Sequence, residues 1–220
     1  MQEAAVILVH GLWMNGMDMS LLRHRIHEAG FATRQFSYPS VRRSPAENAQ
    51  YLDAFARESN HPVVHFIAHS LGGLVLRHLF HNHPDQKPGR IVTMGTPHQS
   101  SSAVRQLSRL RLSRRLLGKS IEAVLTGGVP AWSGSHELGS IAGTLGLGLG
   151  LLIPGIPFPS DGSIAVSETR LDGMQGHVCV SASHTGLLFS RQAALQSLHF
   201  LRHGLFMSVI ANNVKQSIDT

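Results

Sequence analysis

A buried-strand pattern runs directly into a helix pattern at residues 63–73, where the sequence reads VVHFIAHSLGG. The apolar run ends on Ser70, and small residues flank that serine. This arrangement is typical of a sharp turn between a strand and a helix that holds a serine hydroxyl out as a nucleophile. Because the turn is tight, the positions two before and two after the serine must be small, and they are Ala68 and Gly72. A serine here can also serve only as the N-cap of a buried helix, and the segment alone leaves that alternative open.

The rest of the chain alternates short apolar runs with segments of helical period. This alternation predicts an α/β fold, with a mostly parallel sheet of about six strands and helices on both faces. The expected strands cover 5–9, 31–37, 63–68, 91–94, 138–142 and 177–180. The expected helices cover 18–29, 44–55, 71–82 and 190–203. The strand at 63–68 is expected to be central because it is apolar almost throughout. A length of 220 residues suits one domain, 1–220, without a large cap.

Local signals mark some of the element ends. Asp18 is expected to cap the first helix, and Ser44 with Glu47 three residues later matches a capping box for the second. Two stretches, 127–136 and 143–160, are predicted as loops near the carboxyl ends of the strands, where sites on open sheets gather. The sequence leaves open whether 143–160 forms a small mobile flap.

Composition excludes several classes of protein. Apolar residues make up 42% of the chain and charged residues 15%, which disfavours disorder and coiled coils. The single cysteine, Cys179, rules out an intrachain disulfide and is expected to be a small buried hydrophobe. We find no export signal and no apolar run long enough to span a bilayer, so a cytoplasmic location is expected.

The formal net charge of +6 is unevenly distributed. Residues 105–119, with Arg105 and Lys119 at the ends, carry only positive charges, and leucines recur at helical spacing among them. This predicts a basic amphipathic helix, which is either a solvated face or a weak peripheral contact with an anionic membrane surface. Nucleic acid is not an expected partner, because no reading motif accompanies the charge.

A serine hydroxyl needs a base to remove its proton and a carboxylate to orient that base. On sheets of this kind the acid and the base follow the nucleophile in sequence, each on a loop after a later strand. Asp161 follows the fifth expected strand and His184 follows the sixth, so both fit this order after Ser70. The other candidates fit less well; they are Glu168 and Asp172 as the acid, and His136, His177, His199 and His203 as the base.

The negative charge that develops on an attacked carbonyl needs hydrogen-bond donors already in place. One candidate is the backbone N–H of Leu71, directly after the serine. The second is the N–H of Leu12, in the turn after the first strand, where Gly11 allows a sharp bend. We expect His10 to brace this turn by hydrogen bonding.

These residues together resemble the small α/β-hydrolase serine esterases and lipases, including the compact lidless bacterial lipases. The matching segments are HG at 10–11, AHSLGG at 68–73, GTPH at 95–98, the stretch 161–173, and HTGLL at 184–188. The resemblance covers nearly the whole chain and implies a compact α/β-hydrolase fold with a reduced sheet. It also implies Ser70 as nucleophile, Asp161 as acid, His184 as base, and the amides of Leu12 and Leu71 as oxyanion hole.

The expected function is therefore that of a serine carboxylesterase or lipase that hydrolyses short- to medium-chain esters through an acyl-enzyme. Trp13 and Met14 are candidate substrate-binding residues beside the oxyanion turn. No cofactor is expected, and no metal, since His81 and His83 lack further ligands nearby in sequence. The alternatives are an acyltransferase or thioesterase with the same three residues, or a non-catalytic binding protein that keeps the fold.

Overall fold

The structure is a computed structural model. It describes residues 3–99, 101–108, 118–120, 128–132, 134–147 and 156–208.

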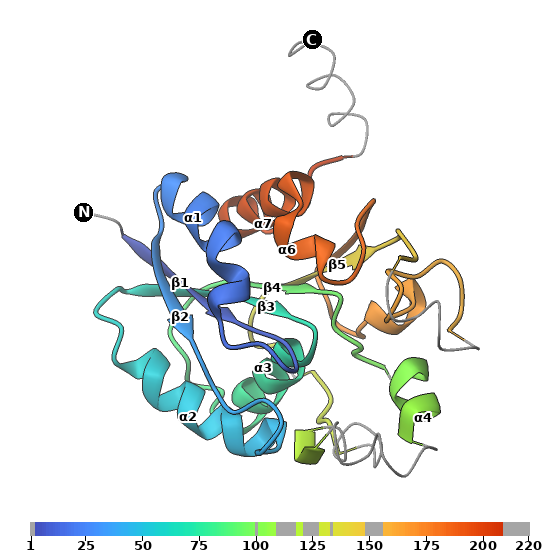
Figure 1. Cartoon of the computed structure of the whole chain (residues 1–220). Coiled ribbons are helices and arrows are strands. Elements are labelled where there is room, and N and C mark those ends of the chain that lie inside the picture. Colours follow the sequence, from blue (N-terminus) through green and yellow to red (C-terminus); the bar gives the residue numbers. More distant parts are fainter. Residues whose placement is uncertain are drawn as a thin grey trace.

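Six parallel strands form one sheet in the order β2-β1-β3-β4-β5-β6 (Figure 1). The strands are β1 (Ala4–Val9), β2 (Ala32–Phe36), β3 (Val63–His69), β4 (Ile91–Met94), β5 (Leu138–Gly143) and β6 (Gly176–Val180). The predicted α/β class, the parallel sheet and the interior place of β3 are confirmed. The carboxyl ends of all six strands lie at one edge of the sheet, because every pairing is parallel.

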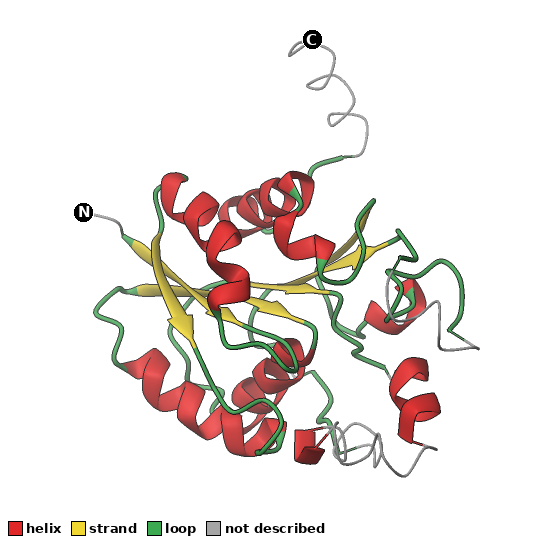
Figure 2. Cartoon of the chain, in the orientation of Figure 1, coloured by secondary structure: helices red, strands yellow, loops and turns green. Residues whose placement is uncertain are grey.

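Helices cover both faces of the sheet, as predicted (Figure 2). One face carries α1 (Ser20–Glu28), α6 (Gly186–Phe189) and α7 (Arg191–His203), and the other carries α2 (Pro45–Arg57) and α3 (Leu71–Asn82). The short elements are η1 (Met17–Met19), η3 (Val166–Thr169) and α4 (Ser102–Ser108). No large cap covers the sheet edge in the part of the chain that the structure describes, and no helix there is long and apolar enough to cross a bilayer.

The interior strands pack alternate side chains into two cores. In β1, Val6 and Leu8 join the core beneath α1 and α7, while Ile7 and Val9 join the core beneath α2 and α3. A strand that is buried on both faces must be apolar throughout, which explains why its sequence lacks the alternation of a half-exposed strand.

The helix ends follow the local signals in part. Ser44 and Glu47 form the predicted capping box, in which Ser44 Oγ accepts from Glu47 N–H at 3.2 Å and Glu47 Oε2 accepts from Ser44 N–H at 2.7 Å. The prediction for Asp18 is wrong, because the turn η1 precedes α1 and the Asp18 carboxylate accepts from Asn15 N–H at 3.3 Å.

Cys179 is exposed, so the prediction of a buried cysteine is also wrong. It lies in β6, the last strand of the sheet, between Val178 and Val180, whose side chains join the core beneath α7. Neighbouring residues of a strand face opposite sides, and at this edge the side of Cys179 is open to solvent.

The loop before β5 does not lie at the carboxyl edge. Pro130 O accepts from Arg77 Nε of α3 at 2.9 Å, and His136 Nε2 lies 3.0 Å from Lys87 O, which precedes β4. The described part of 127–136 therefore runs along α3 to the amino ends of the strands, since a loop that precedes a parallel strand must deliver the chain to its amino end. Most of the basic segment and residues 148–155 of the other loop lie outside the described residues.

Candidate active site

Ser70 lies in a strained backbone conformation between β3 and α3. Its φ of 51° is positive, which is uncommon for a residue other than glycine. Gly72 allows the tight turn, because a Cβ there would lie 2.4 Å from Val9 O and 2.7 Å from His10 O. Thr96 Oγ also holds the turn by donating to Ser70 O at 2.9 Å. The Ser70 hydroxyl makes no capping bond to the helix, which removes the support for a purely structural N-cap.

Two side chains from distant parts of the chain line up with this hydroxyl. His184 Nε2 lies 3.0 Å from Ser70 Oγ, and His184 Nδ1 lies 2.7 Å from Asp161 Oδ2. Gly95 leaves room for this arrangement, because a Cβ there would lie 3.0 Å from Asp161 Oδ2 and 3.1 Å from His184 Nδ1. The structure thus brings together the three residues that the sequence singled out.

Asp161 is completely buried and has several hydrogen-bond donors. Its Oδ1 accepts from Ser163 N–H at 2.9 Å and from Ile164 N–H at 2.7 Å, which leaves Oδ2 for His184. The backbone of the acid loop also accepts from His184 N–H at 2.8 Å. Because a carboxylate only accepts, this set of donors fixes its orientation toward the imidazole.

His69 also holds the loop that carries His184. Its Nε2 lies 3.0 Å from His184 O, and the ring is fully buried. Burial, aided by the nearby His184, lowers the pKa of His69 to about 3, so the ring is neutral and Nε2–H donates to the carbonyl. Sequence reasoning missed this residue, although it lies in the serine motif itself.

His10 braces the turn after β1, as expected. Tyr38 N–H donates to His10 Nε2 at 3.2 Å, and the Tyr38 hydroxyl donates to His10 O at 2.7 Å. Burial lowers the pKa of His10, so the neutral ring accepts at Nε2 and its Nδ1–H donates to Gly11 O at 2.9 Å. The partner Tyr38 comes from the loop after β2, a long-range contact that no short motif reveals.

Leu12 and Leu71 lie on the two segments that meet at Ser70. Leu71 begins α3, and Leu12 follows Gly11, where a Cβ would lie 3.2 Å from Ser70 Cβ. Trp13 has a positive φ of 60°, donates its N–H to Ser40 Oγ at 3.1 Å and leaves its side chain 56% exposed. Met14 is partly buried against the core beneath α1.

The segment after β5 adds exposed apolar side chains beside the acid loop. Leu145 and Leu147 are 42% and 56% exposed, and Phe158 is 81% exposed. Leu145 N–H donates to Ala182 O at 3.1 Å, which ties this segment to the loop that carries His184. We call Leu145, Leu147 and Phe158 the apolar rim.

Among the other candidate acids and bases, Glu168 and His177 have structural partners. Glu168 Oε1 accepts from Ser102 N–H at 2.6 Å and Oε2 accepts from Ala165 N–H at 3.0 Å. His177 Nε2 lies 2.9 Å from Thr169 Oγ, and Asp172 is exposed in a turn. Glu168 therefore links the acid loop to α4 and does not compete with Asp161 for His184.

Comparison with known proteins gives a family match over part of the chain and a shared fold. Residues 2–107, a little under half of the chain, match the family described as "Putative serine esterase (DUF676)". Comparison with curated proteins finds no match in sequence.

Among solved structures, the mature form of the Bacillus licheniformis lipase BlEst2 matches with a TM-score of 0.70 and 18% identity, covering 91% of this chain and 91% of that one. The metagenomic carboxyl esterase MGS0156 matches with a TM-score of 0.68 and 15% identity, and the match covers 83% of this chain but 65% of that one. A monoacylglycerol lipase from Paleococcus ferrophilus matches with a TM-score of 0.57 and 16% identity, covering 83% and 86%. The match over residues 2–107 and the shared α/β-hydrolase fold support a serine ester hydrolase.

Proposed function

We propose that the chain is a carboxylesterase that cleaves short- to medium-chain esters through an acyl-enzyme on Ser70. One observation carries this proposal: His184 lies within hydrogen-bond distance of Ser70 Oγ on one side, at 3.0 Å, and of the buried Asp161 on the other, at 2.7 Å. The neutral imidazole can accept at Nε2 only while Nδ1 carries the proton, and the carboxylate favours that tautomer.

In the first half-reaction Ser70 Oγ attacks the carbonyl carbon of the ester, and its proton passes to His184 Nε2. The carbonyl oxygen becomes an oxyanion that accepts from the N–H groups of Leu12 and Leu71. When this intermediate collapses, the bond to the alcohol oxygen breaks and His184 returns the proton to the leaving alcohol. In the second half-reaction His184 removes a proton from water, the hydroxide attacks the acyl carbon, and the proton then goes to Ser70 Oγ as the acid leaves.

The surroundings of Ser70 support a small acyl group. Trp13, next to the proposed oxyanion turn, and the apolar rim, beside the acid loop, offer exposed apolar surface. Such a surface suits an acyl chain of short or medium length.

The test uses p-nitrophenyl esters of increasing chain length, with a fluorophosphonate probe that labels activated serines. We expect turnover of the butanoate and octanoate esters above that of the palmitate, together with covalent labelling. Both must be lost in Ser70→Ala. Labelling that persists in Ser70→Ala would place the nucleophile elsewhere, and rapid cleavage of emulsified long-chain glycerides without cleavage of short esters would reject the substrate class.

A further inference from the structure

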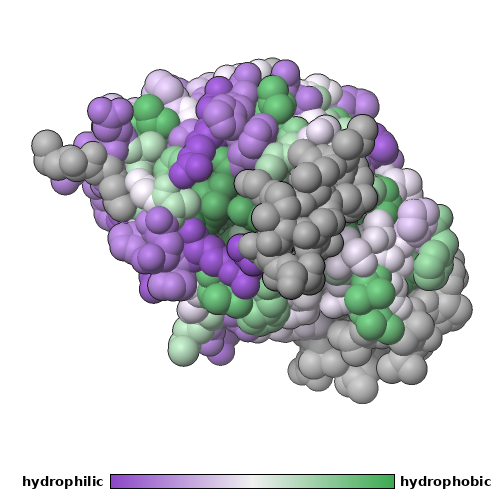
Figure 3. All heavy atoms as spheres, turned by 90° about the horizontal axis from the view of Figure 1, so that it is seen from above, coloured by the Kyte–Doolittle hydropathy of each residue, from purple (hydrophilic) through white to green (hydrophobic). Residues whose placement is uncertain are grey.

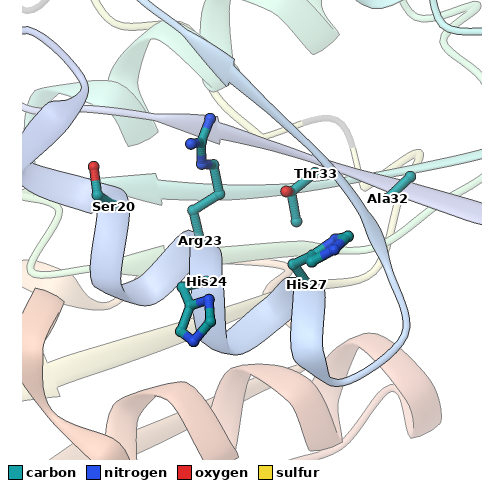
Figure 4. Close-up of a pocket in the computed structure, with 6 residues that line it drawn as sticks. All are labelled: Ser20, Arg23, His24, His27, Ala32 and Thr33. Carbon is teal, nitrogen blue, oxygen red and sulfur yellow. The ribbon is translucent and has the colours of Figure 1, made fainter.

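A cavity lies between α1 and β2, lined by residues that the proposed reaction does not use. Its volume is about 510 Å³, and it is lined by Ser20, Arg23, His24, His27, Ala32 and Thr33. Arg23, His27 and Thr33 lie around the same gap between helix and strand (Figure 4). We call this cavity the α1–β2 groove.

The basic side chains of the groove have no partner in the described part of the chain. Arg23, His24 and His27 make no side-chain hydrogen bond or ion pair with any other residue that the structure describes. Some arginines elsewhere are paired with carboxylates, such as Arg34 with Glu58 at 2.9 Å and Arg57 with Asp53 at 3.0 Å. The guanidinium of Arg23 is therefore available to a ligand.

The groove offers hydrogen-bond donors and no carboxylate. Ser20 and Thr33 add hydroxyls to the guanidinium and the imidazoles. In the described part of the chain β2 pairs only with β1, so the outer edge of β2 also presents unpaired backbone N–H groups. Figure 3 looks down on the side of the molecule that carries α1 and α7, where hydrophilic side chains cover much of the surface outside the grey region.

We propose that the α1–β2 groove binds a phosphate group, carried by a soluble phosphate ester or by a lipid headgroup. A phosphate has several acceptor oxygens and a geometry that a guanidinium can bind with two parallel hydrogen bonds. A volume of about 510 Å³ exceeds that of one phosphate and falls in the usual range of small-molecule sites, so the group that carries the phosphate also has room. This proposal does not depend on the ester hydrolysis at Ser70.

The first test titrates the isotopically labelled full chain with inorganic phosphate at constant ionic strength, and follows the backbone amide signals of α1 and β2. We expect saturable shifts that chloride does not cause. Arg23→Gln should weaken the binding about tenfold, because it removes charge-assisted hydrogen bonds. The matched control is Arg42→Gln, which removes an exposed arginine outside the groove and should leave the affinity unchanged.

The second test separates the two sources of phosphate. The chain is sedimented with vesicles of phosphatidylcholine alone and of phosphatidylcholine mixed with phosphatidic acid. Binding to the mixed vesicles that is lost in Arg23→Gln supports a lipid headgroup, and binding of free phosphate without vesicle binding supports a soluble ester. Shifts that never saturate, or equal losses in the Arg23 and Arg42 variants, would overturn the proposal. A circular dichroism spectrum and a urea denaturation midpoint equal to those of the wild type show that Arg23→Gln is folded.

Discussion

The turn of Ser70 and the loops of Asp161 and His184 are held in place in different ways. Backbone packing fixes the turn: φ of Ser70 is 51°, and α3 approaches β1 so closely that only glycine fits at position 72. Hydrogen bonds to side chains fix the loops, through the two amides on Asp161 Oδ1 and the contact of His69 with His184 O. Substitutions that add side-chain volume should therefore disrupt the turn. The loops should instead be disrupted by the loss of hydrogen bonds or by protonation.

Asp161→Asn tests the loops most severely. The amide can donate to His184 Nδ1 and so favour the tautomer with the proton on Nε2, which cannot accept the proton of Ser70. We expect kcat for a p-nitrophenyl ester to fall by about 10⁴, with the fold retained. The matched control is Asp172→Asn, in an exposed turn, which should keep wild-type activity. An active Asp161→Asn enzyme would mean that another group orients His184.

Gly72→Ala tests the turn. The added Cβ would lie 2.4 Å from Val9 O, a backbone atom that cannot move without displacing β1. We expect the free energy of unfolding to fall by about 3 kcal/mol, measured by urea denaturation. Gly30→Ala is the control for backbone strain alone, since φ is +95° there and the space is open, and it should cost roughly 1 kcal/mol. Equal losses in the two variants would show that close packing at the turn is unimportant.

This contrast explains why the sequence predicted the turn of Ser70 so fully. Its requirements fall on adjacent residues, from the apolar strand through Ser70 to Gly72, so a short window contains them all. The order of strands also located Asp161 and His184, because each follows a strand of the same sheet. The contact of His69 with His184 and the partner of His10, Tyr38, were not foreseen, because each joins segments far apart in the chain.

The wrong predictions have a similar cause. Cys179 sits in an apolar run, but its exposure depends on β6 being an edge strand, which only the strand order reveals. Asp18 matches a helix cap locally, yet the chain forms the turn η1 there and starts α1 two residues later. The path of residues 128–132 and 134–136 along α3 likewise depends on tertiary contacts, such as that of Arg77 with Pro130 O.

Protonation should weaken the protein through His69. Burial holds the pKa of this ring at about 3 in the folded state, whereas an unfolded histidine has a pKa of about 6.5. Below pH 6.5 the unfolded state binds a proton that the folded state does not. The contribution of His69 to the free energy of unfolding is therefore fully present above pH 6.5 and is lost as the pH falls toward 3. This group changes the free energy of unfolding by up to about 1.4 kcal/mol per pH unit. Denaturation of wild type and His69→Gln across this range measures it, and equal slopes would contradict the assignment.

The smallest effect expected is that of His69 on the reaction itself. His69→Leu leaves His184 O without its donor and loosens one of the contacts that position the imidazole, while Asp161 still holds the other side. We expect kcat to fall about tenfold, as for the loss of one buried hydrogen bond, with KM unchanged because the ring does not face the substrate.

His69→Gln keeps an N–H donor of similar reach and should recover much of the rate. Restoration by glutamine separates positioning from a general loss of stability, because both variants remove the buried ring. If the leucine variant keeps the wild-type kcat, the hydrogen bonds of Asp161 alone hold the loop. The contact of His69 with His184 then stabilises the fold without aligning the base.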